Sequence, residues 1–426
     1  MTRKHDEPTG APALDGSTGA PAPELPAGLG YTSDELDARR RRAAKRRRRR
    51  RRLLLVALVI LLALLTPLVY SYATYMTRPS SEPWKIRSVE YLRDHRMAWL
   101  VNDVENWWYG MHAPKKGGPG ITTLPAFGGA SSPRPRTSAS ATPYRPPPVK
   151  SALPVALKNE GQWRPVGQTV GGRPAMYTTV FRSEADYPSI LTYAVWIDAT
   201  RTRLALYPGR YEPPSANPRG PMMIPQGQRQ WALAAFNSGF KQKDGGGGWI
   251  VNGHVDVPMV AGRGTVVAYP DGRVDVLSWS SSIPPGSVVL ARQNLPLIVM
   301  NGKPNPALNA TQRWGYTLNN SVRVWRSAVG VDAHGNLIYV AADNQTAPSI
   351  AAGLVRAGAV RGVELDINAE WPTFNAYALP GCRNPFKIVP NYQQSATRYL
   401  TPDDRDFFVV YAQRPGVTSN PGVPMN

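Results

Sequence analysis

A dense basic run followed directly by an uncharged apolar run constrains this chain more than any other feature of its sequence. Twelve of the fourteen residues at 39–52 are Lys or Arg, and residues 53–70 (LLLVALVILLALLTPLVY) carry no charge. With residues 71–76 added, the stretch is long enough to cross a hydrocarbon core of about 30 Å. Basic residues at one end of a span hold that end in the cytoplasm. We therefore predict a transmembrane signal anchor at 53–76 in the cell membrane, with the N-terminus cytoplasmic and the C-terminal domain extracellular.

Two other interpretations of this region are less favoured. A basic run on its own is typical of nucleic-acid binding, but the adjoining apolar run argues against a nucleic-acid partner. Ser71-Tyr72-Ala73 offers small residues suited to signal-peptide cleavage. The apolar run is nevertheless longer than the roughly 7–15 residues of a signal-peptide core. An uncleaved anchor is favoured, and cleavage remains the alternative.

The charge balance points to an anionic partner outside the membrane. The net charge is +21, of which residues 1–52 carry +7, so the part beyond the uncharged span carries +14. Such a surface attracts polyanions over about a Debye length of ~8 Å. An anionic cell-envelope glycan is the expected partner, and a merely solvated basic surface is the alternative. Arg outnumbers Lys 39 to 11, a bias typical of GC-rich bacterial genomes.

The sequence gives no support for a metal site or a cofactor site. The single Cys excludes an intramolecular disulfide framework, and five scattered His show no paired metal-ligand spacing. No Gly-rich phosphate loop of nucleotide-binding type is present. We therefore predict neither a metal nor a cofactor.

Composition divides the chain into six segments. We predict a disordered basic cytoplasmic tail at 1–52, the anchor at 53–76, a juxtamembrane amphipathic helix at 77–112, a Pro/Gly/Ser linker at 113–150, a folded domain at 151–414 and a tail at 415–426. The apolar stripe of the helix is rich in Trp. Three interpretations of it stay open: it packs on the domain, it mediates self-association through 84–112, or it lies at the lipid interface. The linker would carry the domain away from the bilayer.

The domain at 151–414 has mostly strand signals. A hairpin is predicted at 265–279 around Asp271-Gly272 and a second at 326–341 around 334–336. Further strands are expected at 191–198, 231–236, 363–367 and 407–413, and a short helix at 348–358. The fold class is therefore α+β, a strand-dominated mixed domain with few helices, preceded by the transmembrane and extracellular amphipathic helices.

Two carboxylates on one predicted strand are the strongest catalytic candidates. Glu364 and Asp366 are two residues apart, hence on one face, with about 7 Å between their Cα atoms. Carboxylates at such a separation can share acid, base or nucleophile work at a glycosidic bond. Glu370 follows on the loop. The alternative is a pair of solvated carboxylates at a hairpin edge.

Two upstream motifs complete an ordered set. Asn237-Ser238-Gly239-Phe240 follows a buried strand, and Arg326-Ser327-Ala328-Val329-Gly330 begins another. With Gly358-Ala359 leading to Leu365-Asp366, the set resembles the phosphodiester glycosidase family, the domain of N-acetylglucosamine-1-phosphodiester alpha-N-acetylglucosaminidase. The resemblance spans roughly residues 190–412.

The resemblance implies hydrolysis of a sugar-1-phosphodiester that releases the sugar and leaves a phosphomonoester. By the same resemblance, Asn237 and Gly239 would contact sugar or phosphate, Arg326 would hold phosphate and Asp366 would be the essential carboxylate. An anionic phosphate needs a cation and amide donors, and cleavage at the anomeric carbon needs a carboxylate.

The loop after Asp366 departs from the family pattern. The family has a Gly-rich loop there, whereas this chain has Ile367-Asn368-Ala369-Glu370-Trp371-Pro372. Trp371 could stack on a sugar, and Asn368 or Glu370 could bind its hydroxyl groups. Two alternatives therefore stay open: a non-catalytic envelope glycan-binding protein, and a glycosidase that acts on a neutral glycan.

Overall fold

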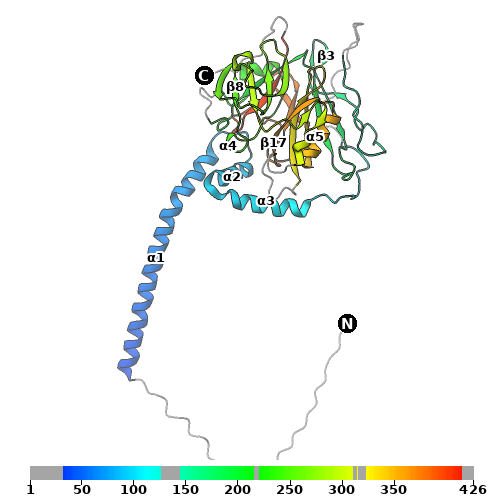
Figure 1. Ribbon diagram of the computed structural model, residues 1–426. Helices are drawn as coiled ribbons and strands as arrows, with labels where there is room; N and C mark the ends of the chain where they lie inside the picture. The colour runs from blue at the N-terminus through cyan, green and yellow to red at the C-terminus, as the bar shows by residue number, and fades with distance from the viewer. Residues whose placement is uncertain (1–31, 126–143, 215–219, 310–313, 315–322, 415–426) are drawn as a thin grey trace, which may run out of the picture. The chain divides into compact units, whose positions relative to one another are not determined.

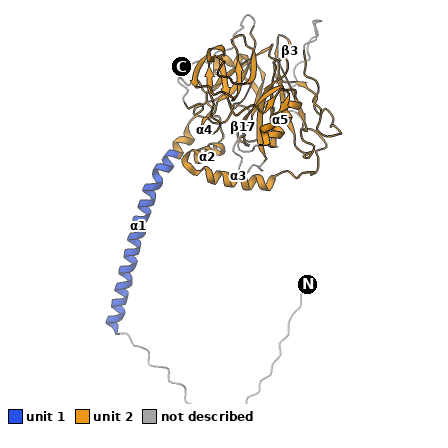
Figure 2. Cartoon of the chain, in the orientation of Figure 1, with its two compact units in different colours: residues 1–71 blue, residues 72–426 orange. Residues whose placement is uncertain are grey.

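The computed structural model describes residues 32–125, 144–214, 220–309, 314 and 323–414. The chain forms two compact units, residues 1–71 and residues 72–426 (Figure 2). Three predicted pieces lie outside the described residues: 1–31 of the cytoplasmic tail, 126–143 of the linker and the tail at 415–426.

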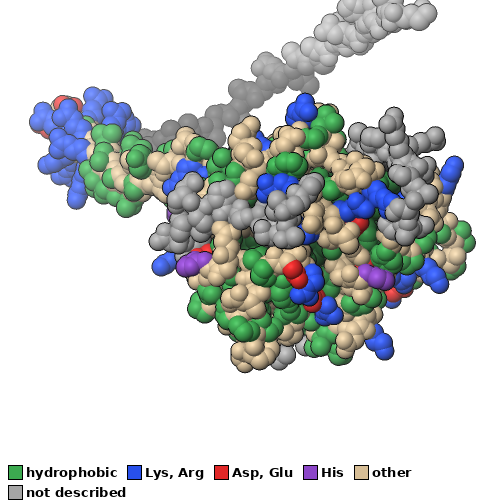
Figure 3. Space-filling view, turned by 90° about the horizontal axis from the view of Figure 1, so that it is seen from above, with side chains coloured by type: hydrophobic (Ala, Val, Ile, Leu, Met, Phe, Trp, Pro, Cys, Tyr) green, Lys and Arg blue, Asp and Glu red, His purple; other side chains and the backbone are tan. Residues whose placement is uncertain are grey.

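The first described element is α1, Ser33–Thr77, which contains both the basic run and the apolar run. A capping pair begins it: the Glu35 N–H donates to Thr32 Oγ1, and the Thr32 N–H donates to the Glu35 carboxylate. The predicted disordered tail is therefore wrong for residues 33–52, because Arg, Ala and Leu favour the helix and no breaker occurs before Pro67. Figure 3 shows the basic side chains gathered next to the apolar stretch. By length and composition α1 suits a membrane span or a signal sequence.

The predicted juxtamembrane helix is two helices. These are α2, Trp84–Leu92, and α3, Ala98–His112, separated by a π-helical turn at Arg93–Met97. The break occurs where Arg96 adopts a left-handed backbone, with φ of 64°, which a continuous right-handed helix excludes.

The Trp-rich stripe of these helices is mostly exposed. Trp99 and Trp107 are exposed, whereas Ile86, Glu90 and Tyr91 of α2 are buried. The domain is therefore contacted by a second face of the helices, which mixes charged and apolar residues.

Both described ends of the predicted linker belong to the fold. Lys116 forms an ion pair with Asp186, with 3.0 Å between nitrogen and oxygen. Val149 is buried in an apolar cluster, and its N–H donates to the Gly161 carbonyl at 2.9 Å. The expected spacer role is wrong for these ends, because they contact the domain instead of separating it from the helices.

Three main antiparallel sheets build the domain (Figure 1). The largest has eight strands in the order β1 Arg164–Pro165, β4 Met176–Phe181, β5 Thr192–Ile197, β16 Leu337–Gln345, β15 Val324–Val331, β17 Arg361–Ile367, β13 Val299–Met300 and β14 Lys303–Pro304. One five-stranded sheet contains β11 Val274–Ser278, β10 Gly264–Ala268, β12 Leu290–Gln293, β8 Trp249–Val251 and β9 His254–Val257. The other contains β19 Arg383–Lys387, β18 Phe374–Leu379, β7 Ala232–Asn237, β20 Phe407–Ala412 and β6 Thr202–Tyr207.

Short elements fill the connections between these strands. They are the pair β2 Thr169–Val170 and β3 Arg173–Pro174, the helices α4 Gln242–Gly245 and α5 Ala347–Arg356, and the 3-10 turns Gln226–Trp231, Pro285–Ser287 and Pro306–Asn309. The α5 helix begins with a capping box between Thr346 and Ser349 and packs on β15 and β16.

The core lies on both faces of the eight-stranded sheet. One face, with Tyr339 and Val329, packs against the two five-stranded sheets, and the other, with Ala328 and Val340, packs against α5. This burial on two sides explains why β15 and β17 are buried along almost their whole length, including the charged residues Arg326, Glu364 and Asp366. The predicted hairpins, strands and helix are confirmed, as is the α+β class.

Candidate functional site

The site is built at the end of β17, where strand pairing is irregular. On β15, Ala328 pairs with Glu364 and Arg326 pairs with Ile367, so two residues of β17, at 365 and 366, lie opposite one residue of β15, at 327. A bulge of this kind re-aims side chains and is frequent beside active sites. Glu364 and Asp366 consequently have separate arginine partners.

Asp366 joins three segments that are distant in sequence. Its carboxylate accepts from Arg405 at 2.5 Å, and its N–H donates to the Ser238 carbonyl at 3.0 Å. Arg405 also donates to the Gly239 carbonyl at 3.2 Å. The ends of β7 and β17 and the segment before β20 therefore meet at one carboxylate, which is only 6% exposed.

Burial sets the ionisation of this carboxylate. It raises the pKa of Asp366 to about 7, although the positive charge of Arg405 acts in the opposite direction. An acid whose pKa lies near neutrality can exchange protons during turnover, so Asp366 has the electrostatic setting of a catalytic group.

This pKa predicts how activity depends on pH. If Asp366 acts as the ionised carboxylate, protonation below about pH 7 removes activity. We expect kcat to rise about tenfold per pH unit below that value and to level off above it. Initial rates of sugar release between pH 4.5 and 9 measure this limb. Burial and the nearby Glu105 also raise the pKa of Glu370 to about 7, so a limb that vanishes in Glu370→Gln would belong to that residue instead.

Asn237 and Gly239 lie close to Asp366, and both make close contacts within the fold. The Asn237 amide donates to Ser327 Oγ at 2.9 Å and accepts from the Tyr339 hydroxyl and the Thr373 N–H. A Cβ at Gly239 would lie 3.2 Å from the Asn294 amide carbon. The pair therefore fixes the loop beside Asp366, and the role of ligand contact stays a prediction.

Arg326 is occupied by a buried carboxylate. Its guanidinium donates to Glu364 at 2.5 Å and to the carbonyls of Gln345 and Trp314 at 3.1 Å each. Burial raises the pKa of Glu364, which Arg326 opposes. Arg326 and Glu364 thus form a buried ion pair within the sheet, not an open phosphate contact.

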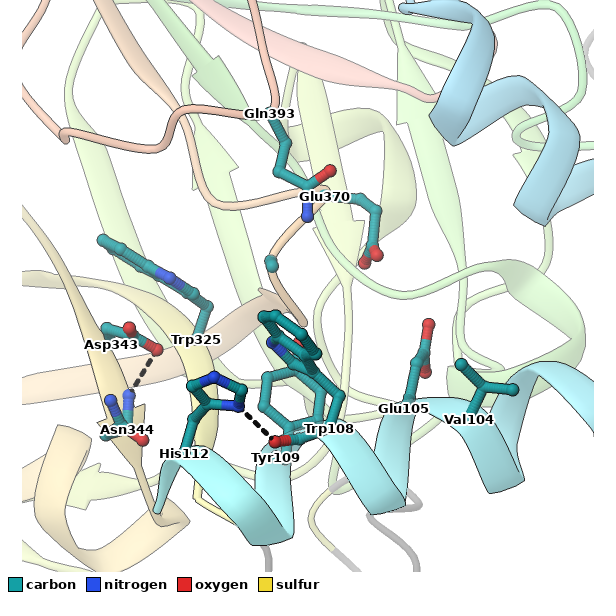
Figure 4. Close-up of a pocket in the computed structure, with 11 residues that line it drawn as sticks. Val104, Glu105, Trp108, Tyr109, His112, Trp325, Asp343, Asn344, Glu370 and Gln393 are labelled. Carbon is teal, nitrogen blue, oxygen red and sulfur yellow. Dashed lines mark hydrogen bonds between the residues drawn. The ribbon is translucent and has the colours of Figure 1, made fainter. Parts of the chain in front are cut away.

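The three residues of the loop after β17 that were expected to bind a sugar have different surroundings. Trp371 is buried, and its ring lies under Arg405 and Arg398, 4.5 and 5.5 Å from the guanidinium carbons, so it does not offer a free face to a sugar. Asn368 adopts a left-handed backbone, with φ of 74°, and its N–H donates to the Trp325 carbonyl. Glu370 extends towards α3 (Figure 4).

Sequence reasoning missed the cations next to Asp366 and the helix that contacts them. Lys241 forms an ion pair with Glu90 of α2, and Lys241, Arg405 and Arg93 lower the pKa of Glu90 against the opposing effect of burial. The available signal for Arg405 was the charged run 403–406 before an apolar strand. Glu90 and Arg93 were hidden among the aromatic residues of 84–112.

Within the described residues, no group of three or more His, Cys, Asp or Glu side chains is arranged to hold a metal ion. The chemistry that this arrangement offers is that of a buried carboxylate with an adjacent guanidinium.

A comparison with known protein families shows what this chain is similar to. Residues 230–366 match the family model of phosphodiester glycosidases. This part of the chain is therefore similar to phosphodiester glycosidases. The matched range begins just before β7 and ends at Asp366, so it includes the motifs at 237–240 and 326–330 and stops at the divergent loop.

Solved structures similar to this chain include two at low sequence identity. The catalytic domain of zebrafish N-acetylglucosamine-1-phosphodiester alpha-N-acetylglucosaminidase, auto-inhibited by its pro-peptide, is 16% identical, with 58% of this chain and 87% of that chain covered and a TM-score of 0.39. A hypothetical protein from Synechocystis is 14% identical, with 58% and 64% covered and a TM-score of 0.32. No curated protein sequence matches the chain.

Proposed function

We propose that this protein is a membrane-anchored, extracytoplasmic hydrolase that cleaves a sugar-1-phosphodiester on a bacterial cell-wall or envelope glycan. Its family acts as glycosidases on phosphodiester-linked sugars. The observation that carries the proposal is Asp366, a buried carboxylate with a pKa near 7 beside Arg405, at the end of the matched range. The apolar run of α1 next to twelve basic residues supports the anchoring and the orientation.

The chemistry follows from the charges at the site. Water attacks the anomeric carbon, the bond from that carbon to the phosphate oxygen breaks, and the phosphate leaves as a monoester anion. The ionised Asp366 would stabilise positive charge on the sugar ring or orient the water. Because phosphate is a fair leaving group, a strong general acid is not required.

A non-catalytic glycan-binding protein is the second candidate. Asp366 and Arg405 are both buried, and Glu90 of α2 pairs with Lys241, the cation on the adjoining loop. A site that stays covered in this way would bind glycan elsewhere on its surface without turnover.

Sugar release by intact cells tests both the chemistry and the location. Cells producing the full chain would receive UDP-N-acetylglucosamine, which does not cross membranes, with cells producing Asp366→Asn as the matched control. We expect free N-acetylglucosamine and UDP from the wild type only. Release that appears only after lysis would contradict the extracytoplasmic location, and no release from this probe or from extracted envelope glycan would favour the binding protein.

A further inference from the structure

A cavity of about 300 Å³ lies between α3, the strands β15 and β16 and the loop after β17 (Figure 4). Its lining includes Trp108 and Glu105 of α3, Trp325 of β15, Asp343 of β16 and Glu370. The α3 residues lie outside the range 230–366 that matches the glycosidase family, so this cavity is formed partly by residues beyond that match.

The size and the aromatic lining suit one sugar ring. Ligand pockets commonly measure roughly 300–1,000 Å³, so this cavity is at the small end. Trp108 is 53% exposed, and its indole stacks on His112 with ring centroids 3.9 Å apart, which holds it in place before a ligand arrives. Flat aromatic side chains beside a few polar groups are typical of pockets that bind small polar ligands with apolar faces.

The lining of the cavity is rich in carboxyl groups and disfavours phosphate. Glu105, Asp343 and Glu370 contribute carboxylates, and the lining residues include no Lys or Arg. Arg93, which is not part of the lining, pairs with Glu105 at 2.6 Å, and its charge also acts on Glu370, so it offsets part of this negative charge. A phosphate group would meet like charge here, whereas hydroxyl and amino groups would meet hydrogen-bond acceptors.

One carboxylate oxygen beside the cavity has no hydrogen-bond partner among the described residues. Glu370 is 7% exposed, and its Oε2 makes no hydrogen bond there. Leaving a buried polar atom unpaired costs about 1–3 kcal/mol, so such an atom is expected to have a use. The close-up shows this carboxylate directed towards α3 and Glu105 (Figure 4).

We propose that this cavity binds an unphosphorylated sugar ring with hydroxyl or free amino groups, as a subsite beside the loop that follows Asp366. Trp108 supplies the apolar face, and Glu370 accepts a hydrogen bond from the sugar. The inference rests on the proposed function only in that the substrate is a glycan, because occupancy of the subsite does not require turnover.

Ligand-observed NMR on the full-length protein in detergent micelles tests the subsite. The probes are glucosamine and N-acetylglucosamine, each compared with its 6-phosphate. We expect both unphosphorylated sugars to bind at least tenfold more tightly than their phosphates. Tighter binding of glucosamine than of N-acetylglucosamine would assign the recognised group to the free amine, and equal binding would assign it to the hydroxyl groups. Equal binding of sugars and phosphates would overturn the proposal.

Two adjacent tryptophans provide the matched variants. Trp108→Ala should weaken sugar binding at least tenfold, and Trp107→Ala, on the same helix but outside the cavity lining, should change it less than twofold. Glu370→Gln should weaken binding without changing the melting temperature. Equal effects of the two tryptophan variants would overturn the subsite.

Separate readouts distinguish this subsite from the proposed hydrolase. If the protein hydrolyses its substrate but Trp108→Ala changes neither sugar binding nor KM, the subsite is refuted and the hydrolase is not. Binding that depends on Trp108 in a protein without turnover would refute the hydrolase alone.

Discussion

The Asp366→Asn variant is expected to lose about 100- to 10,000-fold in kcat for sugar release, the range associated with a positioned acid or base. The amide keeps the size of the carboxyl group but cannot ionise, so it neither stabilises charge on the ring nor takes a proton from water. Because the contact of Asp366 with Arg405 is buried, the variant also removes the counter-charge of Arg405, so its stability has to be measured beside its rate. Initial rates with UDP-N-acetylglucosamine measure the effect.

Two controls separate lost chemistry from lost structure. Arg405 keeps a carbonyl acceptor at Gly239 in the variant, but the melting temperature must still be compared with that of the wild type. Asp271→Asn changes an exposed carboxylate in the turn between β10 and β11 and should leave the rate unchanged. A folded Asp366→Asn protein with a rate within threefold of the wild type would remove Asp366 from the mechanism.

Local signals were sufficient for most of the domain's elements. The hairpin around Asp271-Gly272 follows from turn chemistry, and Gly272 indeed has a φ of 88°. The helix α5 follows from Pro348 near its start and Gly358 after its end. These signals act over a few residues and do not depend on the rest of the chain.

The tertiary contacts that form the site could not be predicted from the sequence. Arg405 lies 39 residues from Asp366, and Arg326 lies 38 residues from Glu364. No local pattern predicts which arginine meets which carboxylate across a sheet. Trp371 illustrates the consequence: its sequence context suggested a sugar platform, whereas two guanidinium groups cover its ring.

The packing of the helices α2 and α3 stayed open in the sequence analysis for a related reason. Periodicity identified an apolar stripe, but the face that contacts the domain carries Glu90 and Tyr91 as well as apolar residues. A charged residue such as Glu90 can be buried in a contact when the other surface provides an opposite charge, as Lys241 does here. Such complementarity is a property of two surfaces, and the hydrophobic pattern of one helix does not contain it.

Arg326→Met is expected to destabilise the domain by about 3–5 kcal/mol, because it leaves the fully buried Glu364 without its cation. The phosphate role suggested by the family resemblance predicts something else, a rise in KM for phosphodiesters in a protein of normal stability. Denaturant unfolding followed by tryptophan fluorescence, together with KM for phosphodiester and neutral substrates, measures both quantities.

Two further variants make this result specific. Replacing both partners, Arg326→Met with Glu364→Leu, should restore most of the stability, since two apolar side chains of similar volume can substitute for a buried ion pair. Arg361→Met removes a partly exposed pair between β17 and Asp275 of β11 and should cost less than about 1 kcal/mol. If Arg326→Met instead keeps normal stability and loses affinity for phosphodiesters alone, then its guanidinium leaves Glu364 to bind phosphate, and the closed ion pair is a resting arrangement of the site.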